Sequence, residues 1–421
     1  MSLLNHPKEI FFTEVDKQIL KNQVIDENNP GSILQDFKFL LDYINSNTVD
    51  ATKANYHIAM KHLVPINEKL IHPIKLKLNR PQQKSFPNIS GLYLLLCSIG
   101  IIRFIYSEKK HIMTLDETIL ELWNNLNPTE QYFTLLESWL LRSQPKEILG
   151  EYSPFGRLLL RTYLDFWKSV PKKGLQNERN RDIEDHIKYV PGLYNIALLE
   201  LFGILSIQQS ETKTGKGWRI LEIKRTDFGN AISKYLYQLD KNIDYLWQYE
   251  YNYEIPFGEW QTAFQSYFPE WRNNLTFPET EFKSGIYLFK VSLGNVWRRI
   301  EICSEMTLED LTDTILAAFD FDKDHLYSYY YKNRFGYTAE INSPNSYEEP
   351  HTIEKLIGEI QIPIGSSMKF LYDFGDNWEF EVLLEKINPL DKKLKSPRII
   401  EERGEPPLQY PDWEDEWNDF E

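Results

Sequence analysis

Apolar residues in the first 85 residues recur at three- and four-residue spacing, which predicts a helical amino-terminal region over residues 1–85. The clearest stripe consists of Ile33, Leu34, Phe37, Leu40, Leu41 and Ile44. Ser32 directly precedes this stripe and is expected to cap the helix. A second helix is expected over residues 52–63, ending before Pro65.

One order of elements then occurs twice, about 100 residues apart. Each copy opens with an apolar helix that begins Gly-Leu-Tyr, at Gly91 and at Gly192, and continues into two strands around a polar turn. A further helix follows each pair of strands. This is the order of a winged-helix unit, so we expect tandem winged-helix-like units over residues 86–250.

The pattern changes in the last third of the chain. Residues 251–283, rich in aromatic residues and proline, are expected to form a connector. Apolar and polar residues then alternate over much of residues 284–400, which predicts strands. A helix capped by Thr307 and a hairpin around the turn 373–377 are also expected there. The expected fold class is therefore α+β: a mainly helical front followed by an α+β domain with a β-grasp-like order of elements.

Residues 401–421 form an acidic tail with nine acids and one base, Arg403. Trp413, Trp417 and Phe420 would share one face of a helix. Two interpretations are open. The tail is a solvated end, as charge blocks commonly are, or it docks on a basic surface of a partner or of this chain.

Composition and charge narrow the functional classes. The chain has 421 residues, of which 42% are hydrophobic, as in globular proteins. Its 47 Lys and Arg against 62 Asp and Glu give a net charge of −15, so nucleic acid would have to bind at a local basic patch. Cys97 and Cys303 lie far apart, which argues against a disulfide framework or a cysteine-based zinc site. No secretory leader or bilayer-length apolar run is visible, so we expect a cytoplasmic protein with no membrane partner.

The second predicted wing carries the densest group of cations. The candidate nucleic-acid-binding residues are Lys213, Lys216, Arg219, Lys224 and Arg225. The helix before this wing is almost entirely apolar, with Asn195 and Glu200 as its main polar residues, so it would be buried and unable to read base edges. A reading helix would have to lie earlier, near Arg179 and Arg181. Alternatively, both units are scaffolds or modules that dock a partner.

The carboxy-terminal third, from about Ser284 to the end, resembles the plasmid pRiA open-reading-frame-three-like family. The resemblance rests on the segments 296–300, 307–308 and 325–326, and above all on Tyr-Asp-Phe-Gly-Asp-Asn-Trp at 372–378. The residues that match the family motif are Trp297, Arg298, Arg299, His325, Tyr372, Asp373, Gly375, Asp376 and Trp378. The front of the chain also looks like an extension that some members carry, through Arg80-Pro-Gln-Gln and Phe86-Pro-Asn.

This resemblance implies a plasmid or mobile-element context, since the family includes TnpR passenger proteins of bacterial insertion elements, but it implies no reaction. The chain departs from the family where Tyr327 replaces a common histidine and where the segment 404–408 contains no cysteine. If those His and Cys positions form a metal site in other members, most of that site is missing here.

The turn at 373–377 has a chemical and a structural interpretation. Asp373, Asp376 and His325 would suit a hard cation such as Mg²⁺, which would support metal-assisted phosphodiester cleavage. Alternatively, the aspartates and the glycine shape a hairpin turn while Phe374 and Trp378 pack on the core, and the sequence favours this interpretation. No metal-binding or phosphate-loop spacing in the sequence supports the chemical interpretation.

Arg298 and Arg299 lie on one predicted strand and should point to opposite faces. One would bind a phosphate or a carboxylate of a partner. Alternatively, one pairs with an acid of the same domain, such as Glu301, and the other lies in solvent, which the sequence favours.

Three functional hypotheses follow. The first is a non-enzymatic binding or regulatory protein that engages DNA or a protein partner, with the acidic tail competing for the basic wing. The second is a Mg²⁺-dependent nuclease at the turn 373–377, and the third is a structural interaction protein. No nucleophile arrangement is visible and no other cofactor is expected, so the sequence leans away from an enzyme. It carries no sign of oligomeric state.

Overall fold

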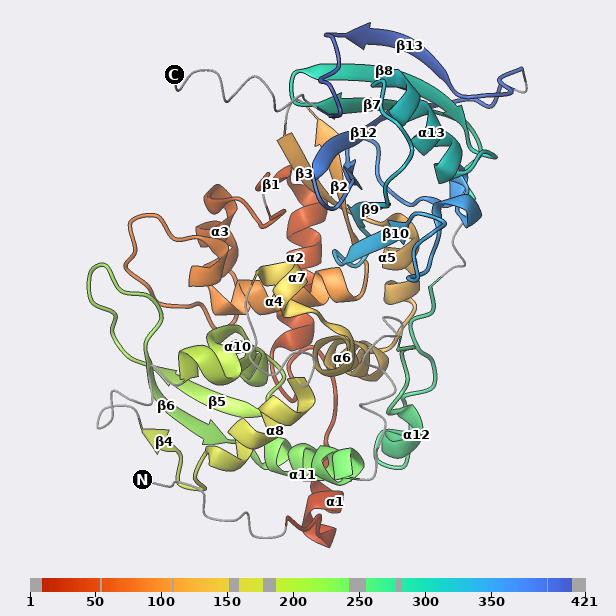
Figure 1. Cartoon of the computed structure of the whole chain (residues 1–421). Coiled ribbons are helices and arrows are strands. Elements are labelled where there is room, and N and C mark those ends of the chain that lie inside the picture. The colour runs from red at the N-terminus through yellow and green to blue at the C-terminus, as the bar shows by residue number, and fades with distance from the viewer. Residues whose placement is uncertain are drawn as a thin grey trace. The chain divides into compact units, whose positions relative to one another are not determined.

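The computed structural model describes residues 10–53, 55–107, 110–150, 159–176, 187–241, 255–277, 282–391 and 393–410 (Figure 1). These residues form two compact units. The amino-terminal unit consists mainly of residues up to 277, and the carboxy-terminal unit mainly of residues from 278 onward. Helices dominate the first and a large sheet dominates the second, so the α+β class is confirmed.

The first repeat is longer than the sequence indicates. Its elements are α2 (Ile33–Ser46), β1 (Val49–Ala51), α3 (Met60–Asn67), α4 (Pro87–Ser98), β2 (Ile102–Ser107) and β3 (Lys110–Leu115). The sheet order is β1-β3-β2. Because β1 pairs with β3, the predicted region 1–85 shares a sheet with the predicted tandem region.

The second repeat has a similar order of described elements, but none of them corresponds to α3, and its last helix corresponds to α5 (Glu117–Asn124), which follows β3. It consists of α8 (Leu159–Ser169), β4 (Leu175–Gln176), α10 (Leu193–Leu201), β5 (Leu205–Gln209), β6 (Ile220–Arg225) and α11 (Asp227–Lys241). Its sheet order, β4-β6-β5, matches that of the first repeat. The strands β1 and β4 are only three and two residues long, too short to show a periodic pattern in the sequence.

The remaining described elements of this unit are not part of the two repeats as defined above. They are α1 (Glu14–Asn22), α5 (Glu117–Asn124), α6 (Pro128–Glu137), α7 (Pro145–Leu149) and α12 (Gln261–Phe264), with a 3₁₀ turn at Gln83–Ser85 and π-helical turns at Ser138–Arg142 and Lys188–Gly192.

Helices α4 and α10, the opening helices of the two repeats, pack against each other. Every residue of α4 is buried, and a Cβ added at Gly91 would lie 2.7 Å from Cγ of Leu198 on α10. The missing side chain at Gly91 therefore allows this close approach. Each repeat covers the apolar helix of the other, which accounts for the lack of polar residues on both.

Two buried glutamates on α6 hold the segment 255–277, part of the predicted connector, within the amino-terminal unit. Glu130 accepts hydrogen bonds from the backbone N–H groups of Arg272 (3.1 Å) and Asn273 (2.6 Å). Glu137 accepts from the N–H groups of Gly258 (2.7 Å) and Trp260 (2.8 Å). Burial nevertheless raises the pKa of Glu137 to about 7.

We therefore expect Glu137 to make the amino-terminal unit less stable as pH rises from 4.5 to about 7. In this window the folded protein retains a proton that the unfolded chain has lost, so the unfolding free energy falls by about 1.4 kcal/mol per pH unit from this group. Urea unfolding at several pH values should give a flatter profile for Glu137→Gln. Equal slopes in both proteins would contradict this.

The carboxy-terminal unit is a seven-stranded sheet with one helix packed on it (Figure 1). The elements are β7 (Ile286–Leu293), β8 (Val296–Cys303), α13 (Leu308–Ala318), β9 (Tyr327–Lys332), β10 (Thr338–Asn342), β11 (Ser367–Tyr372), β12 (Trp378–Asn388) and β13 (Arg398–Arg403), with 3₁₀ turns at Thr352–Glu354 and Ile357–Glu359. The order is β10-β9-β11-β12-β7-β8-β13, and every neighbouring pair is antiparallel.

Alternation along these strands builds the core of the unit. Phe380, Val382 and Leu384 of β12 point to the face that α13 covers, where Phe319 meets Phe380. The capping prediction for α13 is confirmed, because the Thr307 hydroxyl accepts from the N–H of Asp310. Strand β13 crosses the predicted boundary at residue 400, so the first acidic residues of the predicted tail belong to the sheet.

None of the helices that the structure describes is long and apolar enough to traverse a bilayer.

Candidate functional site

The basic loop, defined as residues 210–219 between β5 and β6, exposes three of the five predicted nucleic-acid-binding residues. Lys213, Lys216 and Arg219 are all exposed. The loop closes through hydrogen bonds from the N–H of Ser210 to the carbonyl of Arg219 and from the N–H of Lys216 to the carbonyl of Lys213, both 3.0 Å. In the described part of the chain, none of these three cations makes an ion pair. They present three positive charges on an ordered loop.

The other two predicted residues lie on β6 and have partners of their own. Lys224 pairs with Glu222 at 2.6 Å. Arg225 is partly buried, donates to the carbonyl of Lys168 at 3.0 Å and lies over the Trp167 ring. Burial lowers the pKa of Arg225, in agreement with a packing role. Lys224 is therefore exposed but paired, and Arg225 is held by packing, unlike the three cations of the basic loop.

The helix before the basic loop has no polar group available for base edges. Asn195 of α10 is buried, where its side chain accepts from the indole N–H of Trp139 (2.7 Å) and donates to the carbonyl of Pro191 (2.6 Å). Glu200 accepts from the N–H of Ile207 at 3.1 Å, and burial raises its pKa to about 7. The candidate reading residues Arg179 and Arg181 lie outside the described residues.

Tyr372 of the family motif anchors the loop that precedes β9. Its buried hydroxyl donates to the carbonyl of Asp322 and accepts from the N–H groups of Asp324 (3.1 Å) and His325 (3.3 Å). Burial raises the pKa of this phenol. The tyrosine therefore has a structural task that explains its place in the motif.

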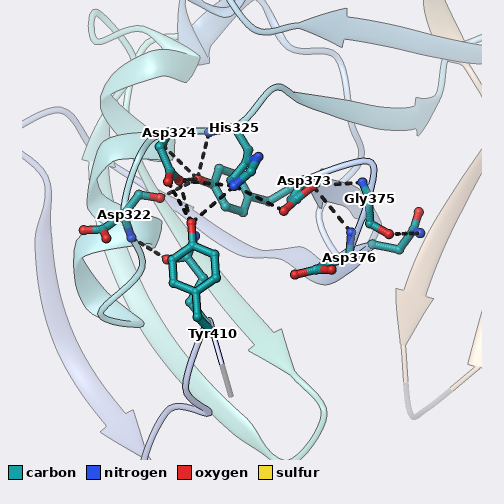
Figure 2. A network of polar contacts seen from close by, with 10 residues as sticks. Asp322, Asp324, His325, Asp373, Gly375, Asp376 and Tyr410 are labelled. Carbon is teal, nitrogen blue, oxygen red and sulfur yellow. Dashed lines mark hydrogen bonds and ion pairs between the residues drawn. The ribbon is translucent and has the colours of Figure 1, made fainter. Parts of the chain in front are cut away.

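Asp373 shapes the turn after β11. Its backbone is left-handed, with φ of 56°, and its Oδ1 accepts from the N–H of Gly375 at 2.8 Å (Figure 2). The N–H of Asn377 donates to the Asp373 carbonyl at 2.7 Å, and Asn377 also has φ of 56°. These bonds account for an aspartate at position 373. A Cβ at Gly375 would lie 3.2 Å from Oδ1 of Asp373, so glycine leaves room for the carboxylate. Trp378 packs on Phe321, with ring centroids 5.0 Å apart.

The expectation that Phe374 packs on the core is wrong, because its side chain is 48% exposed. It occupies the tip of the turn, between Asp373 and Gly375, where the chain reverses away from the sheet.

Figure 2 shows the polar groups that surround His325. Its Nε2 lies 3.2 Å from the Tyr410 hydroxyl, 3.4 Å from Oδ2 of Asp373 and 3.6 Å from Oδ1 of Asp324. The Tyr410 hydroxyl donates to Asp324 at 2.7 Å, which lowers the pKa of Asp324 and raises that of Tyr410. The structure thus joins the segment 409–410 to the loop before β9.

Of the three predicted Mg²⁺ ligands, His325 and Asp373 lie together, and Asp376 meets Asp373 through its backbone N–H at 3.4 Å. Across the described ranges, no group of three or more His, Cys, Asp and Glu side chains is placed to hold a metal ion. The hydrogen bonds of the turn account for the carboxylate of Asp373, whereas Asp376 takes part in them through its backbone N–H.

Arg298 and Arg299 point to opposite faces of β8, as alternation predicts. Arg299 pairs with Glu385, through bonds of 2.7 and 3.0 Å, and with Glu401 on β13. Arg298 is only 4% exposed, so the expectation that one of the two lies in solvent is wrong. Glu301, the predicted partner, pairs with Arg398 instead. Trp297 lies between two cations, with Lys290 and Arg299 each about 5 Å from its ring.

Two exposed lysines that sequence reasoning missed, Lys75 and Lys77, lie beside the basic loop. Thr212 and Lys75 are 137 positions apart along the chain. Only the folded structure brings such distant positions together.

Comparison with known proteins finds a family model that matches the carboxy-terminal third. Residues 285–410 match the family model described as "Plasmid pRiA4b ORF-3-like protein". The matched range contains β8, with its two arginines, and the turn at 373–377. The match supports the resemblance to the plasmid pRiA family in this third of the chain. The name of this family indicates no reaction.

Two further proteins match a similar share of the chain. "Uncharacterized protein y4hQ" of Sinorhizobium fredii is 26% identical over 129 residues, which cover 30% of this chain and 65% of that protein. The chain thus spans about two thirds of the length of this relative. A solved structure, a protein of unknown function (MM3350) from Methanosarcina mazei Go1, has 26% identity over 28% of this chain and 70% of that chain, with a TM-score of 0.26.

Proposed function

We propose that the chain is a non-enzymatic binding protein of a plasmid or mobile-element context that engages DNA in the cytoplasm through its basic loop. The observation that carries this proposal is the exposure of Lys213, Lys216 and Arg219 on one ordered loop of an otherwise acidic protein. An unneutralised cluster of cations binds phosphates by releasing the counterions that surround DNA.

The family match supports the plasmid context only through the name of the family. The nuclease hypothesis gains no support from the turn at 373–377, where Asp373 accepts the hydrogen bonds of the turn and the described residues hold no group of three potential metal ligands. A protein partner remains the competing occupant of the basic loop, and the experiment below separates it from DNA.

We expect Lys213→Glu/Lys216→Glu to weaken binding of a fluorescent 20-base-pair duplex by about tenfold or more at low salt. Reversing two charges removes two phosphate contacts and adds repulsion. The measurement is a fluorescence-anisotropy titration of the full chain.

The matched control is Lys393→Glu/Lys395→Glu, which changes the net charge equally at two exposed lysines of the carboxy-terminal unit. It should bind like the unmodified protein. Equal loss in both variants would mean that net charge alone governs binding. No duplex binding by the unmodified chain would reject DNA as the ligand and favour a protein partner.

A further inference from the structure

A second cationic segment, residues 73–77 from the first repeat, runs beside the basic loop of the second repeat. In Figure 1 the loop between β5 and β6 lies alongside the connection that follows α3. Two backbone hydrogen bonds join them: the N–H of Lys77 donates to the carbonyl of Lys216 at 3.0 Å, and the N–H of Gly215 donates to the carbonyl of Lys77 at 2.6 Å.

Side chains of β5 and of the basic loop extend this attachment. The Gln209 amide accepts from the N–H of Lys75 at 3.0 Å and donates to the carbonyl of Pro73 at 3.0 Å. The Thr212 hydroxyl donates to the carbonyl of Lys75 at 2.8 Å. The attachment uses backbone groups of the lysines, so their ammonium groups remain available to a ligand.

The two segments together form the cationic strip, defined as Lys75, Lys77, Lys213, Lys216 and Arg219. All five side chains are exposed. Lys75 makes a long ion pair with Glu211, at 3.5 Å between Nζ and Oε1, and the Glu211 side chain is 84% exposed. Such an exposed pair holds its lysine weakly. Five cations on a hydrogen-bonded scaffold lose less conformational freedom on binding than five on a mobile loop.

We infer that the cationic strip binds the phosphate backbone of duplex DNA without reading its sequence, and that Lys75 and Lys77 are binding residues equal in weight to those of the basic loop. This inference rests on the proposed function and extends it to a second segment and a ligand class. Phosphate contacts carry affinity, whereas base contacts carry sequence preference.

The mutual burial of α4 and α10 removes these two helices as readers of base sequence. Each of these helices directly precedes the strands of its repeat, and their side chains are buried within the amino-terminal unit. A helix must expose polar side chains to reach base edges in the major groove.

The test compares three full-length variants by anisotropy over a range of salt concentrations. Lys75→Gln/Lys77→Gln should weaken duplex binding about tenfold and reduce the slope of log affinity against log salt by about two, one unit for each lost phosphate contact. Lys213→Gln/Lys216→Gln should do the same. Gln209→Ala keeps every charge but removes two bonds to the segment 73–75, so it should weaken binding about threefold with an unchanged slope, because the number of phosphate contacts stays the same.

The possible outcomes show whether this inference fails alone or together with the proposed function. If the basic-loop variant loses affinity while Lys75→Gln/Lys77→Gln binds like the unmodified chain, the strip is wrong and the basic loop stands alone. If two unrelated duplexes of equal length differ more than tenfold in affinity, sequence is read and the inference fails. Tighter binding to a matched RNA duplex would overturn the assignment to DNA. If the unmodified chain binds no duplex at low salt, both proposals fail.

Discussion

Replacing Gly31 with alanine should destabilise the amino-terminal unit by about 3 kcal/mol or more. A Cβ at Gly31 would lie 2.2 Å from the carbonyl oxygen of Leu201 and 2.4 Å from the amide nitrogen of Gly203. Both neighbours are backbone atoms, so relief requires the loop before α2 and the turn after α10 to separate. Overpacking that must be relieved by backbone movement lies at the costly end of single substitutions.

Gly217→Ala is the matched control, since Gly217 lies in the basic loop and an added Cβ there would have open space. It should leave stability within about 0.5 kcal/mol of the unmodified protein. The measurement is urea unfolding combined with hydrogen exchange of α4 and α10. We expect faster exchange in both helices for Gly31→Ala, because its loop joins the two repeats. Unchanged exchange and an unchanged urea midpoint would contradict the close packing of the repeats.

Arg298→Ala should destabilise the carboxy-terminal unit by about 3–5 kcal/mol. The buried guanidinium donates through Nε to the carbonyl of Ala318 at 3.0 Å, at the end of α13, and through Nη1 to the carbonyls of Arg403 and Gly404, both 3.2 Å. It also lies 5.0 Å from the Phe319 ring. One side chain thus ties the helix to the end of β13, and alanine would leave several carbonyls without a donor.

Arg298→Lys should recover only part of this stability, because one ammonium cannot reach carbonyls on both sides of the site. Arg398→Ala is the control, since Arg398 makes an exposed pair with Glu301 and should cost less than about 1 kcal/mol. Hydrogen exchange of β13 and α13 measures the local effect. If Arg298→Ala and Arg398→Ala unfold alike, this bond network does not explain the first arginine of the family motif.

Local elements of the fold follow from periodicity and caps in the sequence. The stripe from Ile33 to Ile44 predicts α2, which spans Ile33–Ser46, and the cap at Thr307 predicts the start of α13. Ser32 occupies the cap position of α2 but makes no capping bond with its side chain. Helix α3 covers Met60–Asn67 and includes Pro65, so the predicted end before this proline is wrong.

Contacts between residues that lie far apart in the sequence could not be predicted from it. The apolar character of α4 and α10 indicated burial, but nothing in the sequence said that each helix is buried by the other. The role of Arg298 was missed because its partners are backbone carbonyls, which carry no signal in a sequence. Similarly, the attachment of the segment 73–77 to the basic loop uses backbone groups together with one glutamine and one threonine.

The family match and the cationic strip lie in different units of the chain. The carboxy-terminal unit carries the family match, and its motif residues Tyr372, Asp373 and Arg298 all have structural partners. The amino-terminal unit carries the cationic strip. A net charge of −15 disfavours general attraction to nucleic acid, so binding requires a local basic surface, and we propose that the cationic strip supplies it.

The most direct test of this account is an anisotropy titration of the unmodified full-length chain with one duplex at about 50 and about 200 mM salt. Five phosphate contacts predict a log–log slope near −4.5, hence a loss of affinity of several hundredfold between the two conditions. We expect tight binding at the lower salt and this steep loss at the higher. Absence of binding at 50 mM salt, or binding that salt leaves unchanged, would contradict the central claim that the cationic strip engages phosphates.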